Sequence, residues 1–211
     1  MSLHLVTDRG LTMGRSLIEI IRAAVAGGIS LVQLREKDCS TREFVELGKA
    51  VTAVLKGHNV PLIINDRIDV ALAVGAQGVH IGQNDMPYPQ ARAILGAQAI
   101  IGLSVETPEQ ALEANQFDVD YLGLSPVFAT ATKTDLPPHL GLHGVEDIRA
   151  LSRHQLIAIG GINSANAKNV INAGAHGLAV VSALCSASDP KKAAVELCEK
   201  ITAAKITIES A

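Results

Sequence analysis

The stretch of residues 123–133 concentrates groups that bind anions. It begins within the apolar run 121–124 and places two threonine hydroxyls, Thr130 and Thr132, close to the ammonium of Lys133. Short hydroxyl donors beside a compact cation suit a phosphate or a diphosphate. A solvated polar loop has the same composition, so this stretch alone does not decide between the two. Similar polar clusters follow other apolar runs, and together they outline one site.

A second polar cluster lies at the end of the apolar run that starts at residue 31. Alternate side chains of a strand point to opposite faces, which puts Gln33, Arg35 and Lys37 on one face. Two cations and an amide on that face form a clamp for an anion. An exposed strand end is the alternative, mainly for Lys37, whereas an inward, unpaired Arg35 would be costly.

Two acidic residues, Asp66 and Asp85, follow the apolar runs 62–65 and 78–81. We expect them at adjacent strand ends, where two carboxylates repel unless a cation or a proton lies between them. Mg²⁺ favours one or two carboxylates together with phosphate oxygens and water, so it is the cation that we predict here. The alternative is that these residues cap the helices that follow, most readily for Asp66.

The nucleophile and base candidates are weaker. Ser104 ends the run 100–104 but lies in no G-x-S-x-G motif, which favours a hydrogen-bonding role. His80 falls inside a predicted strand and is interpreted as a satisfied core or supporting histidine. We place His139 and His143 in a solvent-facing loop, so no base–nucleophile pair is expected. The chemistry should therefore depend on a good leaving group, a metal and positioning.

A neutral anion site is predicted at the other end of the chain. The Gly160–Gly161 pair lets backbone amides approach an oxyanion, and Ser182 follows the last strand. Barrel enzymes often bind phosphate with the loops after strands 7 and 8. Two anion sites on one face result: a cationic one (Arg35, Lys37, Asp66, Asp85, Lys133) and a neutral one (Gly161, Val181, Ser182).

The elements that must position these groups alternate along the chain. Eight predicted strands cover residues 3–7, 31–35, 62–65, 78–81, 100–104, 121–124, 156–159 and 178–181. Helical patterns cover residues 16–26, 41–56, 69–74, 88–95, 108–115, 145–151, 165–173 and 190–203. This alternation predicts an α/β fold, a single-domain (β/α)₈ TIM barrel over residues 1–211. An open doubly wound sheet is the alternative, because periodicity does not show closure. The insert 125–144 is too long for a passive connection and is interpreted as a functional loop.

Composition narrows the function classes. Of 211 residues, 48% are hydrophobic and only 2% are aromatic, which fits an aliphatic core around buried parallel strands. The net charge of −3 and the scarcity of stacking aromatics argue against a nucleic-acid binder.

The cysteine content and the distribution of apolar residues indicate the cellular compartment of the protein. Three widely spaced cysteines (Cys39, Cys185 and Cys198) indicate free thiols in a reducing compartment. We see no signal peptide and no apolar run of about 20 residues that could span a bilayer, so we expect a cytoplasmic protein that binds no membrane.

Taken in order along the chain, these motifs resemble the thiamine-phosphate synthase family. The most specific are His-x-Gly-Gln-x-Asp at 80–85 and Pro-Val-Phe with Thr-x-Thr-Lys at 126–133. The others are Val-Thr-Asp at 6–8, Gln-Leu-Arg-Glu-Lys at 33–37, Asn-Asp at 65–66, Gly-Leu-Ser at 102–104, Ile-Gly-Gly-Ile at 159–162 and Val-Val-Ser at 180–182.

The resemblance implies a (β/α)₈ enzyme that joins hydroxymethylpyrimidine diphosphate to hydroxyethylthiazole phosphate. Pyrophosphate leaves first, and the thiazole nitrogen captures the resulting cation. Carried over by motif, the diphosphate would meet Gln33, Arg35, Lys37, Asn65 and Lys133, with Mg²⁺ on Asp66 and Asp85. Ser104 would assist the reaction near the diphosphate. The residues expected to be catalytic are Arg35, Lys37, Ser104 and Lys133. The thiazole phosphate would meet Thr130, Thr132, Gly161, Val181 and Ser182. The resemblance thus assigns the two threonines to the thiazole phosphate, whereas their position beside Lys133 suggested the diphosphate.

Two alternatives stay open at this point. A related thiazole tautomerase shares the barrel but usually lacks the metal carboxylates and carries a histidine where Ser104 stands. A non-catalytic, phosphate-binding regulatory barrel is the other. Asp66, Asp85 and Ser104 favour the synthase, although His139 is an insertion relative to the expected loop. The sequence is compatible with a homo-oligomer.

Overall fold

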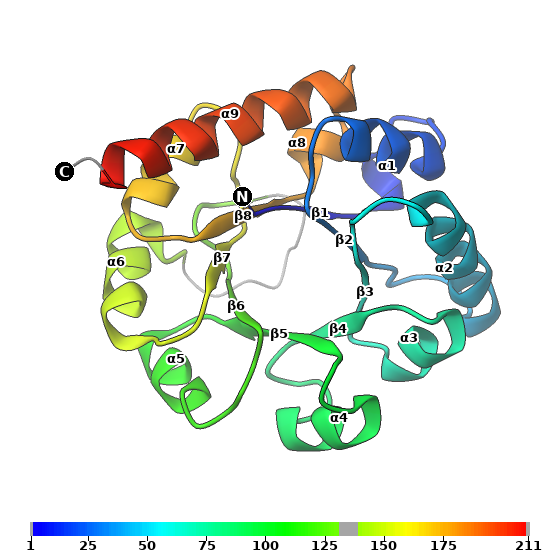
Figure 1. Ribbon diagram of the computed structural model, residues 1–211, viewed down its shortest axis with the longest axis horizontal. Coiled ribbons are helices and arrows are strands. Elements are labelled where there is room, and N and C mark those ends of the chain that lie inside the picture. The colour runs from blue at the N-terminus through cyan, green and yellow to red at the C-terminus, as the bar shows by residue number, and fades with distance from the viewer. Residues whose placement is uncertain (1, 131–138, 210–211) are drawn as a thin grey trace.

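The strands form the predicted closed barrel. The computed structural model describes residues 2–130 and 139–209. Eight parallel strands pair in chain order, and β8 pairs with β1 to close the ring. They are β1 (Leu3–Val6), β2 (Leu31–Leu34), β3 (Leu62–Asn65), β4 (Gly78–Ile81), β5 (Ile100–Val105), β6 (Tyr121–Leu124), β7 (Leu156–Ala158) and β8 (Gly177–Val180). Figure 1, viewed along the barrel, shows the helices as an outer ring around the strands. The (β/α)₈ prediction is confirmed, and the open sheet is excluded.

The helices follow the strands as the alternation predicts. They are α1 (Leu17–Ala26), α2 (Thr41–Leu55), α3 (Ile68–Val74), α4 (Tyr88–Leu95), α5 (Pro108–Ala114), α6 (Gly141–Leu151), α7 (Ala167–Asn172), α8 (Ser182–Cys185) and α9 (Pro190–Glu209), with a 3₁₀ turn, η1 (Arg9–Leu11). Their boundaries have local causes. Ser40 and Glu43 form a reciprocal capping box at the start of α2. Gly75 ends α3 in the left-handed conformation that glycine adopts without strain.

Several boundaries differ from the prediction. The helix α6 begins at Gly141, so His143 is an exposed residue of a helix rather than of a loop, and its Nδ1 lies 3.2 Å from Glu146 Oε2. The helix α9 continues to Glu209 instead of ending at residue 203. Both η1 and α8 were missed, because three or four residues are too few to show a helical period.

Two hydrophobic clusters hold the barrel together. The larger one lies between the sheet and the helices and contains the outward side chains of the strands, such as Leu34 and Ile81. The smaller one fills the interior of the barrel with Val6, Leu31, Ile63, Tyr121, Ile157 and Ala179. This second cluster packs inside the barrel, directly below the polar residues at the carboxyl ends of the strands.

Two further expectations concern the thiols and the membrane. Cys39 is partly buried, Cys185 and Cys198 are buried, and all three are free thiols. Among the described residues, no helix is both long enough and apolar enough to cross a bilayer.

Candidate active site

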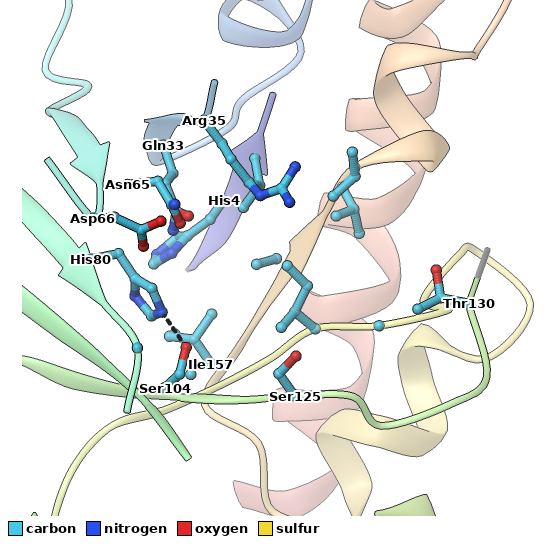
Figure 2. A pocket seen from close by; sticks show the side chains of 18 of the residues that line it. His4, Gln33, Arg35, Asn65, Asp66, His80, Ser104, Ser125, Thr130 and Ile157 are labelled. Carbon is cyan, nitrogen blue, oxygen red and sulfur yellow. Dashed lines mark hydrogen bonds between the residues drawn. The ribbon is translucent and has the colours of Figure 1, made fainter. Parts of the chain in front are cut away.

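A cavity of about 330 Å³ opens at the carboxyl ends of the strands. Eleven of the thirteen predicted site residues line it: Gln33, Arg35, Lys37, Asn65, Asp66, Asp85, Ser104, Thr130, Gly161, Val181 and Ser182. The other two, Thr132 and Lys133, lie outside the described residues. Figure 2 shows several of these side chains converging from different strands on one space. The structure therefore brings together, from β2 to β8, groups that the sequence only placed at strand ends.

Two carboxylates meet on one side of the cavity. Asp66 follows β3 in a left-handed conformation with φ of 63°, unusual for a residue with a side chain and a mark of functional sites. Its backbone N–H donates to the carbonyl of His80 over 2.8 Å, which ties the end of β3 to β4. The residue at the start of α3 is Arg67, so the helix-cap alternative for Asp66 is wrong.

Asp85 is held beside Asp66. The Gly82 N–H donates to Asp85 Oδ2 over 2.7 Å. Burial raises the pKa of Asp85, the hydrogen bond from Gly82 opposes that rise, and contact with the Asp66 carboxylate adds to it. A carboxylate whose charge is disfavoured by a second carboxylate beside it marks a site that favours a cation.

The donor set suits Mg²⁺. Both charged ligands are hard carboxylate oxygens, and the pocket leaves room for phosphate oxygens and water, as this ion requires. Within the described ranges, no group of three or more His, Cys, Asp or Glu side chains gathers around one point. A zinc-type cage is therefore not built there, whereas the two-carboxylate arrangement fits magnesium.

The cationic clamp follows the predicted alternation of β2. Gln33, Arg35 and Lys37 all line the cavity. Glu36 turns away, and its Oε2 accepts from Arg9 Nε over 2.6 Å. Lys37 Nζ lies 2.5 Å from Asp66 Oδ2, so the clamp and the acidic pair are in direct contact.

Ser104 has a histidine beside it, a contact that the sequence did not predict. His80 Nε2 lies 2.8 Å from Ser104 Oγ, and His80 Nδ1 lies 2.9 Å from the Tyr121 hydroxyl (Figure 2 shows the first contact). His80 belongs to β4 and is buried, as predicted, but it lines the cavity rather than the outer core. The third partner is a phenol and not the carboxylate of a hydrolase triad.

The sequence analysis also missed His4 and Tyr121. Both are buried, line the cavity and point into the barrel from β1 and β6. Burial lowers the pKa of His4 to about 4, and the nearby His80 contributes. Period-two alternation from Val6 and Gly123, which also line the cavity, was the signal that could have found them.

The opposite side of the cavity is neutral. Gly160 and Gly161 have φ of 102° and 63°, and a Cβ on Gly161 would lie 2.9 Å from the Cβ of Phe128. Glycine is therefore required at this turn, which leaves backbone free to approach a ligand. Figure 2 shows Thr130 on this side, well separated from Asp66.

Comparison with known proteins gives consistent results. The family model described as "Thiamine monophosphate synthase" matches residues 3–184. The thiamine-phosphate synthase of Albidiferax ferrireducens is 53% identical over 201 residues, which cover 95% of this chain and 92% of that one. That of Syntrophomonas wolfei is 53% identical over 188 residues, covering 89% and 90% of the two chains.

Solved structures agree with these relatives. A thiamine phosphate pyrophosphorylase from Pyrococcus furiosus superimposes with a TM-score of 0.87 at 38% identity, and 96% of each chain is covered. A 3-hexulose-6-phosphate synthase, at 18% identity and a TM-score of 0.69, shares the fold alone.

Proposed function

The chain belongs to the thiamine monophosphate synthase family, and from that membership we propose how its pocket carries out the reaction. It is a thiamine-phosphate synthase, a transferase that releases pyrophosphate and acts on phosphorylated thiamine precursors. The high identities to synthases set aside the tautomerase and the binding-only alternatives. The substrates that we propose are hydroxymethylpyrimidine diphosphate and hydroxyethylthiazole phosphate, and the product is thiamine monophosphate.

One observation carries the assignment of the two ends of the pocket. The acidic pair is in contact with the ammonium of Lys37 on one side, whereas Thr130 lies apart from Asp66 and next to the glycine turn. A diphosphate with its metal suits the first side, because its several negative charges need cations. A monophosphate suits the second, where backbone N–H groups and hydroxyls bind an anion without a full positive charge.

On the diphosphate side, Asp66 and Asp85 would hold Mg²⁺. When bound, the ion supplies positive charge that offsets the charge of the departing pyrophosphate. Arg35 and Lys37 would bind the same oxygens. Lys133, outside the described residues, is proposed to join them on the basis of the family motif.

The pyrimidine side of the substrate would enter the barrel interior. Gln33 and Asn65 are buried amides beside it and would hydrogen-bond to the diphosphate, with Ser104 close by. On the thiazole side, Thr130, Thr132, Gly161, Val181 and Ser182 would hold the phosphate. These contacts fix both reacting atoms in one cavity, which lowers the entropic part of the barrier.

We propose a dissociative order of bond changes. The C–O bond to the diphosphate breaks, both electrons leave with pyrophosphate, and a pyrimidine-methyl cation forms. The lone pair of the thiazole nitrogen then makes the new C–N bond. That nitrogen carries no proton, so no general base is needed, and the apolar interior around Ile157 and Tyr121 limits the access of water to the cation.

The test is the electronic demand of the pyrimidine. An analogue with an electron-withdrawing group in place of the ring methyl should react much more slowly in a single turnover at saturating substrates, because the cation is destabilised. A rate that stays level or rises would indicate direct displacement and overturn the mechanism. Equilibrium binding of the analogue, measured separately, shows that a slow rate does not come from an empty site.

For the protein as a whole, we propose a cytoplasmic location and a homo-oligomeric assembly. The three free thiols suit a reducing compartment. Sedimentation of the purified protein would give the assembly state directly.

A further inference from the structure

Tyr121 is a buried phenol that lines the pocket, and its hydroxyl has no role in the proposed reaction. Its hydroxyl lies 2.9 Å from His80 Nδ1, and the two rings stack with centroids 5.5 Å apart. His4 meets the same ring edge-on at 5.4 Å. The phenol is thus fixed by contacts on more than one side, and its oxygen faces one chosen atom of His80.

The hydrogen bonds around Tyr121 have a direction. Burial raises the pKa of Tyr121 well above its ordinary value, so the phenol keeps its proton. A hydrogen bond with the Gln33 side chain opposes that rise. A buried hydroxyl donor is rarely left without an acceptor, and His80 Nδ1 lies 2.9 Å from the phenol oxygen, so we assign the phenol proton to this nitrogen.

The protonation of His80 follows. If Nδ1 accepts from Tyr121, the neutral ring carries its proton on Nε2. That N–H faces Ser104 Oγ at 2.8 Å, so His80 donates to the serine. The serine proton is then directed away from His80, towards the cavity that Ser104 lines.

The fold makes a specific space for this arrangement. A Cβ on Gly102 would lie 2.5 Å from His80 Nδ1, and one on Gly123 would lie 2.8 Å from His80 Cε1. Real Cβ atoms do not approach so closely, so glycine at both positions lets the imidazole pack directly against β5 and β6. The fold therefore leaves a defined space for the His80 imidazole, in which its two nitrogens face Tyr121 and Ser104.

We propose that Tyr121 and His80 are positioning residues: the Tyr121 hydroxyl holds His80 in the Nε2–H form, and His80 in turn holds Ser104 as a hydrogen-bond donor to the substrate. This proposal rests on the proposed role of Ser104 near the diphosphate. The contact between Ser104 and His80 would then have a different role from the Ser–His pair of a hydrolase. The imidazole donates to the serine instead of removing its proton, so Ser104 is not a nucleophile.

The first test needs neither a variant nor activity. In the ¹⁵N-histidine-labelled protein, NMR at neutral pH should show His80 Nε2 as the protonated nitrogen and Nδ1 as the unprotonated acceptor. A proton found on Nδ1 overturns the proposal. Because this readout requires no turnover, it decides the hydrogen-bond direction even if the proposed reaction is wrong.

The second test separates positioning from packing. Tyr121→Phe should lower kcat about two- to tenfold, the scale of one lost hydrogen bond, with smaller changes in the KM of both substrates. In a Ser104→Ala background the same substitution should cause no further loss, because both changes act through one hydroxyl. Equal losses in the two backgrounds would mean that Tyr121 only packs, and would overturn its role.

A matched control exists because the chain has only two tyrosines. Tyr88 lies on α4, and its hydroxyl donates to the carbonyl of Asp118. Tyr88→Phe removes a phenol hydroxyl away from the pocket, so kcat should stay at the wild-type value. If Tyr88→Phe lowered kcat as much as Tyr121→Phe does, the loss would reflect general destabilisation and would contradict the proposal.

Discussion

Lys37 Nζ and Asp66 Oδ2 lie 2.5 Å apart and join the cationic clamp on β2 to the acidic pair after β3. A metal ion that binds Asp66 must therefore compete with the Lys37 ammonium. The ammonium that is displaced is already at the edge of the pocket, where diphosphate oxygens would meet it. We infer that metal and diphosphate binding are linked through this ion pair. The metal ion would take the place of the Lys37 ammonium at Asp66, and the diphosphate would give that ammonium a new partner.

Asp85→Asn should raise the magnesium concentration needed for half-maximal turnover by roughly tenfold or more, because one of two charged ligands is lost. The measurement is initial rate against magnesium concentration. Asp147→Asn, an exposed carboxylate on α6, is the matched control and should leave the curve unchanged. An unaltered magnesium requirement in Asp85→Asn would remove Asp85 from the metal site.

The same variant makes a stability prediction. Burial and the adjacent Asp66 raise the pKa of Asp85, so its charged form is disfavoured in the fold. Replacing the carboxylate with an amide should therefore not lower the free energy of unfolding of the metal-free protein. Urea denaturation in the presence of a chelator tests this, and it also shows whether a loss of turnover comes from misfolding.

Arg35→Lys should lower the single-turnover rate by roughly tenfold to a hundredfold, with a smaller change in substrate affinity. The planar guanidinium can hold two oxygens of a departing pyrophosphate, and a lysine keeps the charge but loses that geometry. The comparison is Arg22→Lys, an exposed residue of α1. Weaker binding with an unchanged single-turnover rate would limit Arg35 to ground-state binding.

The strand ends were predictable because their signal is local. Alternation along residues 33–37 is enough to put Arg35 and Lys37 on the pocket side and Glu36 on the other, and the structure confirms both. Parallel strands bring their carboxyl ends to one edge, which is why Asp66 and Asp85 could be paired without knowing the register.

The contact between His80 and Ser104 could not be predicted in the same way. It depends on the register of β4 against β5, in which His80 lies opposite Gly102, and on the space that Gly102 and Gly123 leave. Register in a barrel is set by closure of the whole ring, which no single segment of sequence encodes. His4 and Tyr121 were missed for a different reason: the alternation that places them inside the barrel is local, but within short buried strands they look like ordinary core positions.

Gly102→Ala should destabilise the protein by about 1–3 kcal/mol, the usual effect of overpacking a tight core. The new Cβ would meet both His80 and Tyr121. Gly123→Ala is the companion variant, because its Cβ would meet His80 and not the phenol. Urea denaturation should rank Gly102→Ala as the less stable of the two. Wild-type stability in Gly102→Ala would show that the rings have more room than the structure allows.

His4 should make the protein lose stability in mild acid. Burial, helped by His80, lowers the pKa of His4 from 6.5 to about 4 in the folded chain. As the pH falls below 6.5, the unfolded chain binds a proton that the folded chain refuses until about pH 4. Stability is therefore fully present above pH 6.5 and is lost between these two values, by an amount on the order of 3 kcal/mol.

Other groups titrate in the same range, so the test is a difference. The free energy of unfolding of the wild type should fall relative to that of His4→Gln as the pH is lowered from 7.5 to 4.5. The exposed His143 supplies the control: Glu146 and Asp147 raise its pKa, so lowering the pH should not make the wild type lose stability relative to His143→Gln. If the difference between wild type and His4→Gln were constant with pH, His4 would titrate alike in both states, and burial in the barrel would not suppress its charge.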